Sequence, residues 1–177
     1  GKYVRNQWKE IDGKWYHFRK YGEMDTSKWI GSYYVKSDGA MAASELVYDP
    51  TYNSSFYFDK DGNYLSKQWK EVDGERYYFK DGGYMAKNEW IDSYFIKGNG
   101  RMAKGEMQYD QSTGSSYYFK EDGTYAKNYW AQVGGYWYYF KSNGKVARKE
   151  WIDNQYYVLD NGKMATGTHI IDHYQYV

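Results

Sequence analysis

The chain repeats one residue pattern along almost its whole length, and this repetition limits the folds it can adopt. Each repeat begins at one residue, in most repeats Trp, which we call the anchor. An aromatic run follows and ends at one apolar residue, which we call the closing residue. Gly follows four residues later, then Met, Tyr or Val after two more, and the next anchor comes at one fixed distance from the closing residue, as from Phe18 to Trp29. The anchors are Trp8, Trp29, Leu46, Trp69, Trp90, Met107, Trp130, Trp151 and His169, and the closing residues are Phe18, Val35, Phe58, Phe79, Ile96, Phe119, Phe140 and Val158. The pattern predicts a repeat architecture with eight full repeats and part of a ninth.

The spacing within the repeats has a second, longer period. Counted from anchor to closing residue, it runs 10, 6, 12, then again 10, 6, 12, and finally 10, 7. Three kinds of repeat therefore alternate in a super-repeat, whose period separates Trp8, Trp69 and Trp130 equally. One extra residue near positions 154–155 accounts for the final 7. We expect a single repeat array over residues 1–177, and because it begins and ends inside a repeat, we expect it to be a piece of a longer protein.

Each repeat has the pattern of a β-hairpin. In the first repeat, residues 8–11 and 14–18 are rich in aromatic and β-branched side chains and flank Asp12-Gly13. Asp-Gly favours a type I′ turn, because that turn needs φ > 0 at both central residues. Asp73-Gly74 and Gly134-Gly135 stand at the same place. The repeats of spacing 6 have a tighter loop and those of spacing 12 a longer one. We expect the glycine after each hairpin to form a left-handed turn.

The composition indicates how such hairpins are stabilised. Aromatic residues make up 23% of the chain, with 25 Tyr and 8 Trp, yet the mean hydropathy is −1.03. A single two-stranded hairpin is marginally stable in water, so each hairpin needs a neighbour to cover its aromatic face. Tyr suits this contact because its ring packs while its hydroxyl stays in water. The sequence therefore predicts an all-β fold, a solenoid (superhelix) of stacked β-hairpin repeats.

Charge and composition exclude several classes of function. The formal net charge of +1 gives no basic surface for nucleic acid. No apolar run approaches the length of a membrane-spanning helix, so we expect no membrane insertion, and the lack of Cys removes disulfides and thiolate metal sites. The three His (His17, His169 and His173) have no metal-binding spacing, and His17 stands where the equivalent repeats have Tyr. We therefore expect no catalytic residue, no metal and no cofactor in this chain.

The repeats resemble a known family. Trp8, followed by Trp15-Tyr16 and Gly22-Glu23-Met24, and the fuller copy over residues 130–147, are similar to the choline-binding repeats of streptococcal and phage surface proteins. The alternating repeat lengths further resemble the choline-binding module of a pneumococcal-type endo-β-N-acetylglucosaminidase. The resemblance implies a non-catalytic module that recognises choline or phosphocholine on wall teichoic acid and lipoteichoic acid. It also implies a secreted protein at the bacterial cell surface, whose parent is a surface protein or a murein hydrolase.

In this family choline binds in an aromatic cage, and the resemblance implies two complete cages here. A quaternary ammonium has no hydrogen-bond donor, so a site selects it with aromatic rings, each contact contributing about 0.5–2 kcal/mol. The anchor Trp and hairpin Trp of one repeat combine with a Tyr of the next, which gives Trp8, Trp15 and Tyr33, and Trp130, Trp137 and Tyr156. Tyr34 is an alternative to Tyr33 as the third wall. Met24 and Val146 are expected to close the cages on the apolar side.

The other repeats have lost part of the cage. Three anchors have no second Trp in their hairpin: Trp29, Trp90 and Trp151. They are candidates for weaker sites or for packing. In the fourth repeat, Arg76 replaces the hairpin Trp beside Trp69, and Tyr94 follows in the next repeat. Trp69 and Tyr94 are candidates for a further weak site, although the charge of Arg76 is expected to repel an ammonium group. Alternatively, its guanidinium plane stacks on Trp69.

Other functions remain open from the sequence. Glucan- and carbohydrate-binding repeats share the Gly…Tyr-Tyr-Phe pattern, although sugar sites usually add hydrogen-bonding side chains beside the ring. A catalytic wall-hydrolase domain would need a non-repeated acid cluster, and only residues 166–177 depart from the repeat. The middle repeats, with eroded Trp walls, are alternatively structural spacers. The aromatic faces at the ends of the array predict end-to-end self-association.

Overall fold

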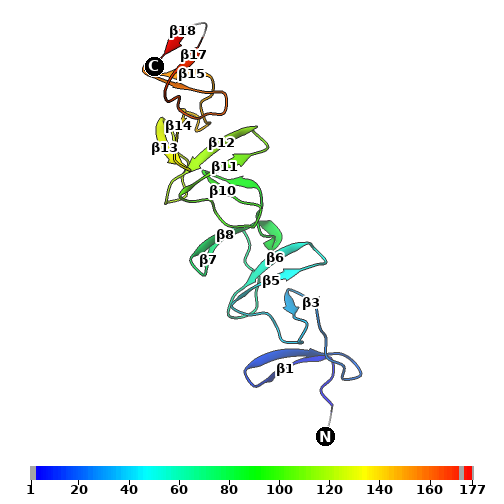
Figure 1. Ribbon diagram of the computed structural model, residues 1–177. Coiled ribbons are helices and arrows are strands. Elements are labelled where there is room, and N and C mark those ends of the chain that lie inside the picture. The colour runs from blue at the N-terminus through cyan, green and yellow to red at the C-terminus, as the bar shows by residue number, and fades with distance from the viewer. Residues whose placement is uncertain (1–2, 172–173, 177) are drawn as a thin grey trace. The chain divides into compact units, whose positions relative to one another are not determined.

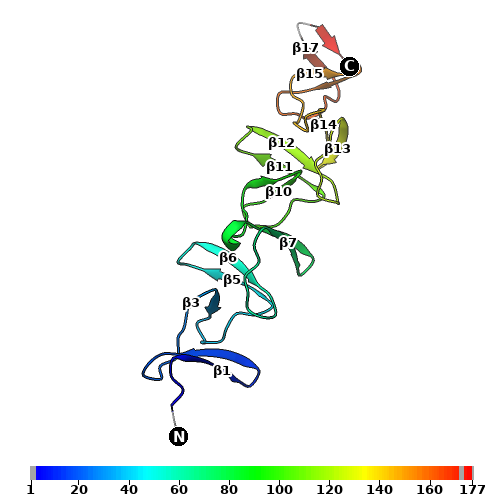
Figure 2. The same ribbon diagram turned by 180° about the vertical axis from the view of Figure 1, so that it is seen from behind.

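The computed structural model describes residues 3–171 and 174–176, and in this part of the chain the fold consists of β-hairpins. The contacts divide the chain into a first unit, Gly1–Ala86, and a second unit, Lys87–Val177. The strands of the first unit are β1 (Gln7–Ile11), β2 (Lys14–Phe18), β3 (Lys28–Ile30), β4 (Tyr33–Val35), β5 (Glu45–Asp49), β6 (Ser54–Phe58), β7 (Gln68–Val72) and β8 (Glu75–Phe79). A short 3₁₀ turn, η1 (Asp81–Gly83), follows them. Figures 1 and 2 show the hairpins of this unit in chain order.

The second unit has the same construction. Its strands are β9 (Glu89–Ile91), β10 (Tyr94–Ile96), β11 (Glu106–Asp110), β12 (Ser115–Phe119), β13 (Tyr129–Val133), β14 (Tyr136–Phe140), β15 (Glu150–Ile152), β16 (Tyr156–Val158), β17 (His169–Ile171) and β18 (Tyr174–Tyr176). Each strand of the described residues pairs antiparallel with its sequence neighbour, which gives nine two-stranded sheets. The predicted all-β hairpin-repeat fold is confirmed. The described part of residues 166–177 also forms a hairpin, while His173 lies outside the described residues.

The hairpin turns have the geometry that the sequence predicts. Asp12 and Gly13 have φ of 50° and 75°, and Asp73-Gly74 and Gly134-Gly135 are also positive at both positions. The loop between β15 and β16 spans residues 153–155 and is one residue longer than Gly31-Ser32 between β3 and β4. The extra residue in the eighth repeat therefore lies in a hairpin loop and leaves the strands in register.

A glycine turn follows each of the first eight hairpins and returns the chain to that hairpin. In the seventh repeat Gly144 has φ of 80°, and its N–H donates to Lys141 O at 2.8 Å. Phe140, the closing residue of β14, then pairs with Val146 in an isolated β-bridge. A Cβ at Gly144 would overlap the ring of Tyr125, lying 2.6 Å from its Cε2, so this position requires glycine for space as well as for φ.

Successive hairpins within a unit are joined through these returning segments. The N–H of Met41, after the second hairpin, donates to Trp15 O in β2 at 2.8 Å. In the second unit the N–H of Met164 donates to Trp137 O at 2.8 Å. The closing residues form the core between hairpins: Val35, Phe58, Phe79, Ile96, Phe119, Phe140 and Val158 are at most 1% exposed. Each unit is therefore held together by contacts between neighbouring hairpins, as expected for a repeat protein.

Candidate functional site

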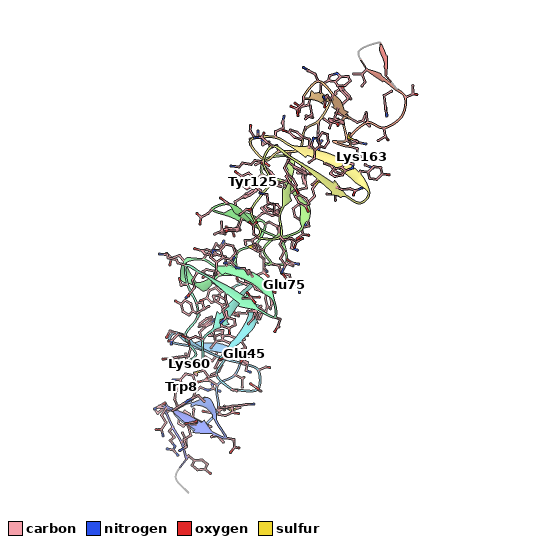
Figure 3. The ribbon with its side chains drawn as sticks, turned by 90° about the vertical axis from the view of Figure 1, so that its left-hand side faces the viewer. Trp8, Glu45, Lys60, Glu75, Tyr125 and Lys163 are labelled. Carbon is pink, nitrogen blue, oxygen red and sulfur yellow. The ribbon has the colours of Figure 1, made fainter. Side chains whose placement is uncertain are left out.

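The first candidate site is a cavity of about 250 Å³ in the first unit. It is lined by Trp8, Trp15, Tyr33, Met41 and Asp61. The Trp8 and Tyr33 rings meet edge to face, with centroids 5.7 Å apart and planes at 75°. Trp15 is 43% exposed, so one wall of the cavity is open to solvent. Trp8, on β1, is labelled in Figure 3. We call the cavity walled by Trp8, Trp15 and Tyr33 the first cage.

Strand register brings the two Trp of this cage together. Trp8 on β1 is the direct partner of His17 on β2, and Trp15 precedes His17 by two residues. Because side chains alternate along a strand, Trp15 and His17 lie on the same face of the hairpin as Trp8. The next hairpin supplies the third wall through Tyr33 on β4, and the bond from Met41 to Trp15 holds the two hairpins together.

The structure distinguishes between the two tyrosines that the sequence left open. Tyr33 lines the first cage, whereas the adjacent Tyr34 points to the opposite face of β4. Tyr34 is 5% exposed and packs against Trp29 and Phe58, with ring centroids 5.3 and 6.1 Å away. Its burial, together with the nearby charge of Asp49, raises the pKa of Tyr34 above its usual value. The ring that faces the first cage is therefore Tyr33.

A second cavity of the same construction lies in the second unit. It has a volume of about 340 Å³ and is lined by Trp130, Trp137, Tyr156 and Met164. The centroids of Trp130 and Tyr156 are 5.6 Å apart, with planes at 76°. Trp137 is 42% exposed. We call this the second cage. The geometry is thus nearly the same in two places, and both sets of three rings expected from the sequence are brought together.

The methionine positions expected from the sequence were wrong by one repeat. The first cage is lined by Met41 rather than Met24, and the second by Met164 rather than Val146. Val146 is instead buried in the core of its own hairpin, beside Phe140. The reason is that the segment after a hairpin docks on the preceding hairpin, so the cage takes its thioether from the same repeat as its Tyr wall.

The sequence left packing open as a role for Trp29 and Trp90, and the structure gives each of them a buried hydrogen-bond partner that was not predicted. Trp29 donates its indole N–H to Asp49 at 2.7 Å, and Trp90 donates to Asp110 at 3.0 Å. Both carboxylates are buried, at 2% and 4% exposure. In both pairs the acid lies 20 residues after the Trp, so the pairing recurs with the period of the super-repeat. The third equivalent, Trp151, packs on Tyr157 at 5.3 Å and borders a separate cavity with His169.

The fourth repeat has its own cation in place of a cage wall. The guanidinium carbon of Arg76 lies 5.0 Å from the centroid of the Trp69 ring. Of the two outcomes open from the sequence, stacking on Trp69 is the one observed. Tyr94, the other candidate of this set, belongs to the second unit, where it pairs with Ile91. One face of the Trp69 ring is thus covered by Arg76, a side chain of the same unit.

His17 lies on the hairpin face, as the sequence predicted, but it has a buried partner that was not predicted. Its Nδ1–H donates to Asp25 Oδ2 at 2.6 Å, and its ring meets Trp8 at 5.2 Å. Asp25 also faces Arg19 Nε at 3.2 Å and Lys28 Nζ at 3.5 Å. Burial raises the pKa of Asp25, but the bond from His17 and the charge of Lys28 outweigh it, so that this pKa lies below its ordinary value of 3.8.

Residues 3–171 and 174–176 contain no group of three or more His, Asp or Glu side chains placed to hold a metal ion. In the same part of the chain no helix is long and apolar enough to span a membrane.

Comparison with known proteins identifies the repeats. The family described as choline-binding repeat matches residues 23–64 and 145–177, and the one described as putative cell wall binding repeat matches residues 6–24, 67–85 and 128–146. Two curated Streptococcus pneumoniae proteins, each named putative endo-beta-N-acetylglucosaminidase, are 39% identical over 82 residues. That match covers 46% of this chain but only 12% of each relative, so the chain corresponds to a small part of them.

Solved structures agree with this assignment. The autolysin LytC of Streptococcus pneumoniae is 41% identical with a TM-score of 0.82, and the match covers 98% of this chain and 41% of LytC. The choline-binding domain of CbpL from the same species is 36% identical with a TM-score of 0.53, covering 90% of this chain and 97% of that domain. This chain belongs to the choline-binding repeat family and is one of its binding modules.

Proposed function

We propose that the chain attaches its parent protein to the bacterial cell wall by binding choline groups of teichoic acids in the first and second cages. The observation that carries this proposal is the repetition of one site: the same three rings and a methionine line a cavity once in each unit. Two open cavities with exposed Trp walls are what a small ligand requires.

The lining of the cages suits a quaternary ammonium group. Three ring faces offer negative electrostatic potential to a cation, and a methyl-rich headgroup also gains apolar contact with the rings and the thioether. The first cage has a carboxylate at its rim as well, Asp61, which is paired with Lys60 Nζ at 2.7 Å. Because Lys60 already balances this charge at an exposed position, the rings supply most of the attraction.

The same lining is less suited to a sugar. The second cage is formed by Trp130, Trp137, Tyr156 and Met164, without a carboxylate, amide or aliphatic hydroxyl. A sugar ring needs several hydrogen bonds to replace those it loses to water, whereas choline keeps only one hydroxyl to satisfy. We therefore favour choline over the glucan alternative for both cages.

Attachment to the wall depends on several weak sites acting together. A single small cation in a half-open cage gains about 4 kcal/mol, which corresponds to a millimolar dissociation constant. Teichoic acids present many choline groups on one polymer, so filling one cage raises the local concentration of choline at the other. This places the chain at the cell surface, outside the membrane. The hydrolase activity named for the relatives would reside in parts of a parent protein beyond this module.

Titration with free choline tests the proposal. Equilibrium dialysis measures the number of choline molecules bound to the intact chain, with 3,3-dimethylbutan-1-ol as the neutral isostere. We expect Trp15→Ala and Trp137→Ala each to lower the number by one, while Tyr21→Ala, at a 74% exposed ring outside both cages, leaves it unchanged. Equal binding of the isostere, or unchanged binding in both Trp variants, would contradict the proposal.

A further inference from the structure

The first unit contains another aromatic cavity, at Trp29, that differs from both cages. It has a volume of about 290 Å³ and is lined by Trp29, Gly31, Tyr52, Phe56, Tyr64, Gly82 and Tyr84. Two of these rings are well exposed: Tyr52 at 51% and Tyr84 at 37%. The lining therefore consists of five aromatic rings and two glycines, without a charged side chain.

The cavity occupies the same repeat register as a cage, but its second wall has a different origin. Trp29 takes the anchor position of Trp8, and Phe56 takes the position of Tyr33, two residues before the closing residue. The hairpin wall is missing, because Ser32 stands where the first repeat has Trp15. Tyr52 from the long β5–β6 loop and Tyr84 after η1 supply the missing rings instead.

The ring geometry shows that these two tyrosines form one wall. Their centroids are 5.9 Å apart with planes at 78°, and Tyr84 also lies 5.4 Å from Phe56. The ring centroid of Trp29 lies 6.4 Å from that of Tyr52 and 5.8 Å from that of Tyr64. The exposed tyrosines are thus held in place by ring contacts rather than free in solvent.

A buried carboxylate favours a cation in this cavity over a neutral ligand. The Trp29 indole N–H is donated to Asp49 Oδ2 at 2.7 Å, and Asp49 is 2% exposed. A carboxylate that accepts this hydrogen bond increases the electron density of the indole ring, which strengthens the attraction of the ring face for a cation. The raised pKa of Tyr34 has the Asp49 charge among its causes, so this charge acts on the surrounding rings.

The chain also contains a natural control for this cavity. The equivalent positions one super-repeat later keep the anchor and its acid, as Trp90 and Asp110. Tyr52 is replaced there by Thr113, and Tyr84 by Lys145. The second unit therefore retains the packed Trp–Asp pair but lacks both added rings, and has a positive charge at one of the two positions.

We propose that the cavity at Trp29 is a third site for a quaternary ammonium group, in which Tyr52 and Tyr84 replace the hairpin Trp of the two cages. This proposal rests on the proposed function for its ligand, choline, but not for its residues. Trp90 does not form such a site. The chain thus binds choline at three places, two of them in the first unit.

Indole N–H signals in a ¹⁵N spectrum of the Trp-labelled intact chain can test each site separately. The 8 Trp give separate reporters. We expect choline to shift the signal of Trp29 as well as those of the cage Trp, and to leave Trp90 unshifted. In the double variant Tyr52→Thr/Tyr84→Lys, choline affinity at Trp29 should fall about tenfold while the cage signals shift as before. That variant copies residues that the second unit tolerates.

The reverse exchange tests the same idea by gain of binding. Thr113→Tyr/Lys145→Tyr is expected to make the Trp90 signal respond to choline. An unshifted Trp29 in the parent chain, or an unchanged choline affinity at Trp29 in the double variant, overturns the third site. Failure of the cage Trp to respond would instead contradict the proposed function, so the two failures are distinguishable. A response of Trp29 to 3,3-dimethylbutan-1-ol equal to that with choline would also overturn the proposal, since it would show an apolar site.

Discussion

At the scale of single residues, one hairpin position decides whether a repeat keeps an open cage. This position is Trp15, Arg76 and Trp137 in the three repeats of equal hairpin length, which lie one super-repeat apart. Where it is Trp, a cavity opens beside the anchor. Where it is Arg, the guanidinium lies over the anchor ring and takes the place that a ligand cation would need. The residue at this position therefore either forms a wall of the cage, as Trp, or fills the cage itself, as Arg.

Exchange at this position should change the number of ligands bound. We expect Arg76→Trp to uncover the Trp69 ring, add a second wall and raise the number of bound choline molecules by one. Trp15→Arg should lower the number by one, because its guanidinium can reach Trp8 as Arg76 reaches Trp69. Equilibrium dialysis with both variants measures the change. If neither count changes, these Trp are packing residues and the cage assignment is wrong.

The first repeat also differs from the fourth at two other positions. His17 and Asp25 stand where the fourth repeat has Tyr78 and Ala86. Asp25 is buried, His17 is half-buried with its ring against that of Trp8, and the carboxyl of Asp25 has a pKa below the ordinary value. A lowered pKa means that Asp25 stabilises the fold above about pH 4, and that this stabilisation is lost as the pH falls through its folded-state pKa.

The expected result is a first unit that is sensitive to acid. Below pH 4 the melting temperature should fall more steeply in the parent chain than in His17→Tyr/Asp25→Ala, which restores the residues of the fourth repeat. Thermal unfolding followed by circular dichroism between pH 3 and pH 7 measures this difference. Parallel curves for the two proteins would show that the pair does not contribute in this way.

At the scale of elements, the turns after the hairpins are constrained more tightly than the turns within them. Gly144 and Gly135 have nearly equal φ, 80° and 83°. A Cβ at Gly144 would overlap Tyr125, whereas a Cβ at Gly135 would meet nothing within 4 Å. The two positions therefore separate the conformational requirement for glycine from the requirement for space.

Alanine at these two positions should have unequal effects. Gly135→Ala should lower the free energy of unfolding by about 1–2 kcal/mol, the cost of positive φ for a residue with a side chain. Gly144→Ala should cost more, because the Tyr125 ring must also shift, which disturbs its contact with Trp90 at a centroid distance of 5.5 Å. Urea unfolding of both variants gives the comparison. Equal midpoints would indicate that the junction between hairpins is looser than the structure describes.

Local features of these elements could be predicted from the sequence, whereas contacts between elements could not. The turn at Asp12-Gly13 follows from backbone preference, and the facing of Trp8 and Trp15 from strand alternation, so both were predictable. The choice of Met41 over Met24 depends on which neighbour the returning segment docks against. The acceptor for Trp29, Asp49, lies in the next hairpin for the same reason. Such contacts depend on how hairpins pack, which the pattern of one repeat does not contain.

At the scale of the whole molecule, the two cages are independent in their construction. The first cage takes its rings from residues 8–33 and the second from residues 130–156, each within one unit. The bonds that join the hairpins of each cage, from Met41 to Trp15 and from Met164 to Trp137, also lie within one unit. Each half of the chain thus has a complete cage.

Separated halves should therefore keep their ligands but lose wall affinity. We expect fragments 1–86 and 87–177 to bind free choline as the intact chain does at the respective cage. On a choline-bearing polymer, the intact chain should bind roughly 100-fold more tightly than either fragment, through effective concentration. Isothermal titration and polymer-binding assays measure the two quantities. Fragments equal to the intact chain on polymer would exclude joint use of the cages.

The end-to-end association expected from the sequence stays a prediction for the intact molecule. Exposed aromatic faces on a repeat protein favour association of one copy with another. Sedimentation velocity over a range of concentrations should show an average mass that rises with concentration. A constant monomer mass at the highest concentration would contradict it.

Because each cage takes two walls from one hairpin and the third from the next, the proposed binding of a headgroup implies a clamp between these hairpins under mechanical load. When the wall polymer and the parent protein pull in opposite directions, the junction between these hairpins cannot open without breaking the cage. A ligand that binds only the closed junction slows its rupture and raises the force needed to unfold it. The proposal therefore implies that a repeat with a bound headgroup unfolds at a higher force than an empty one.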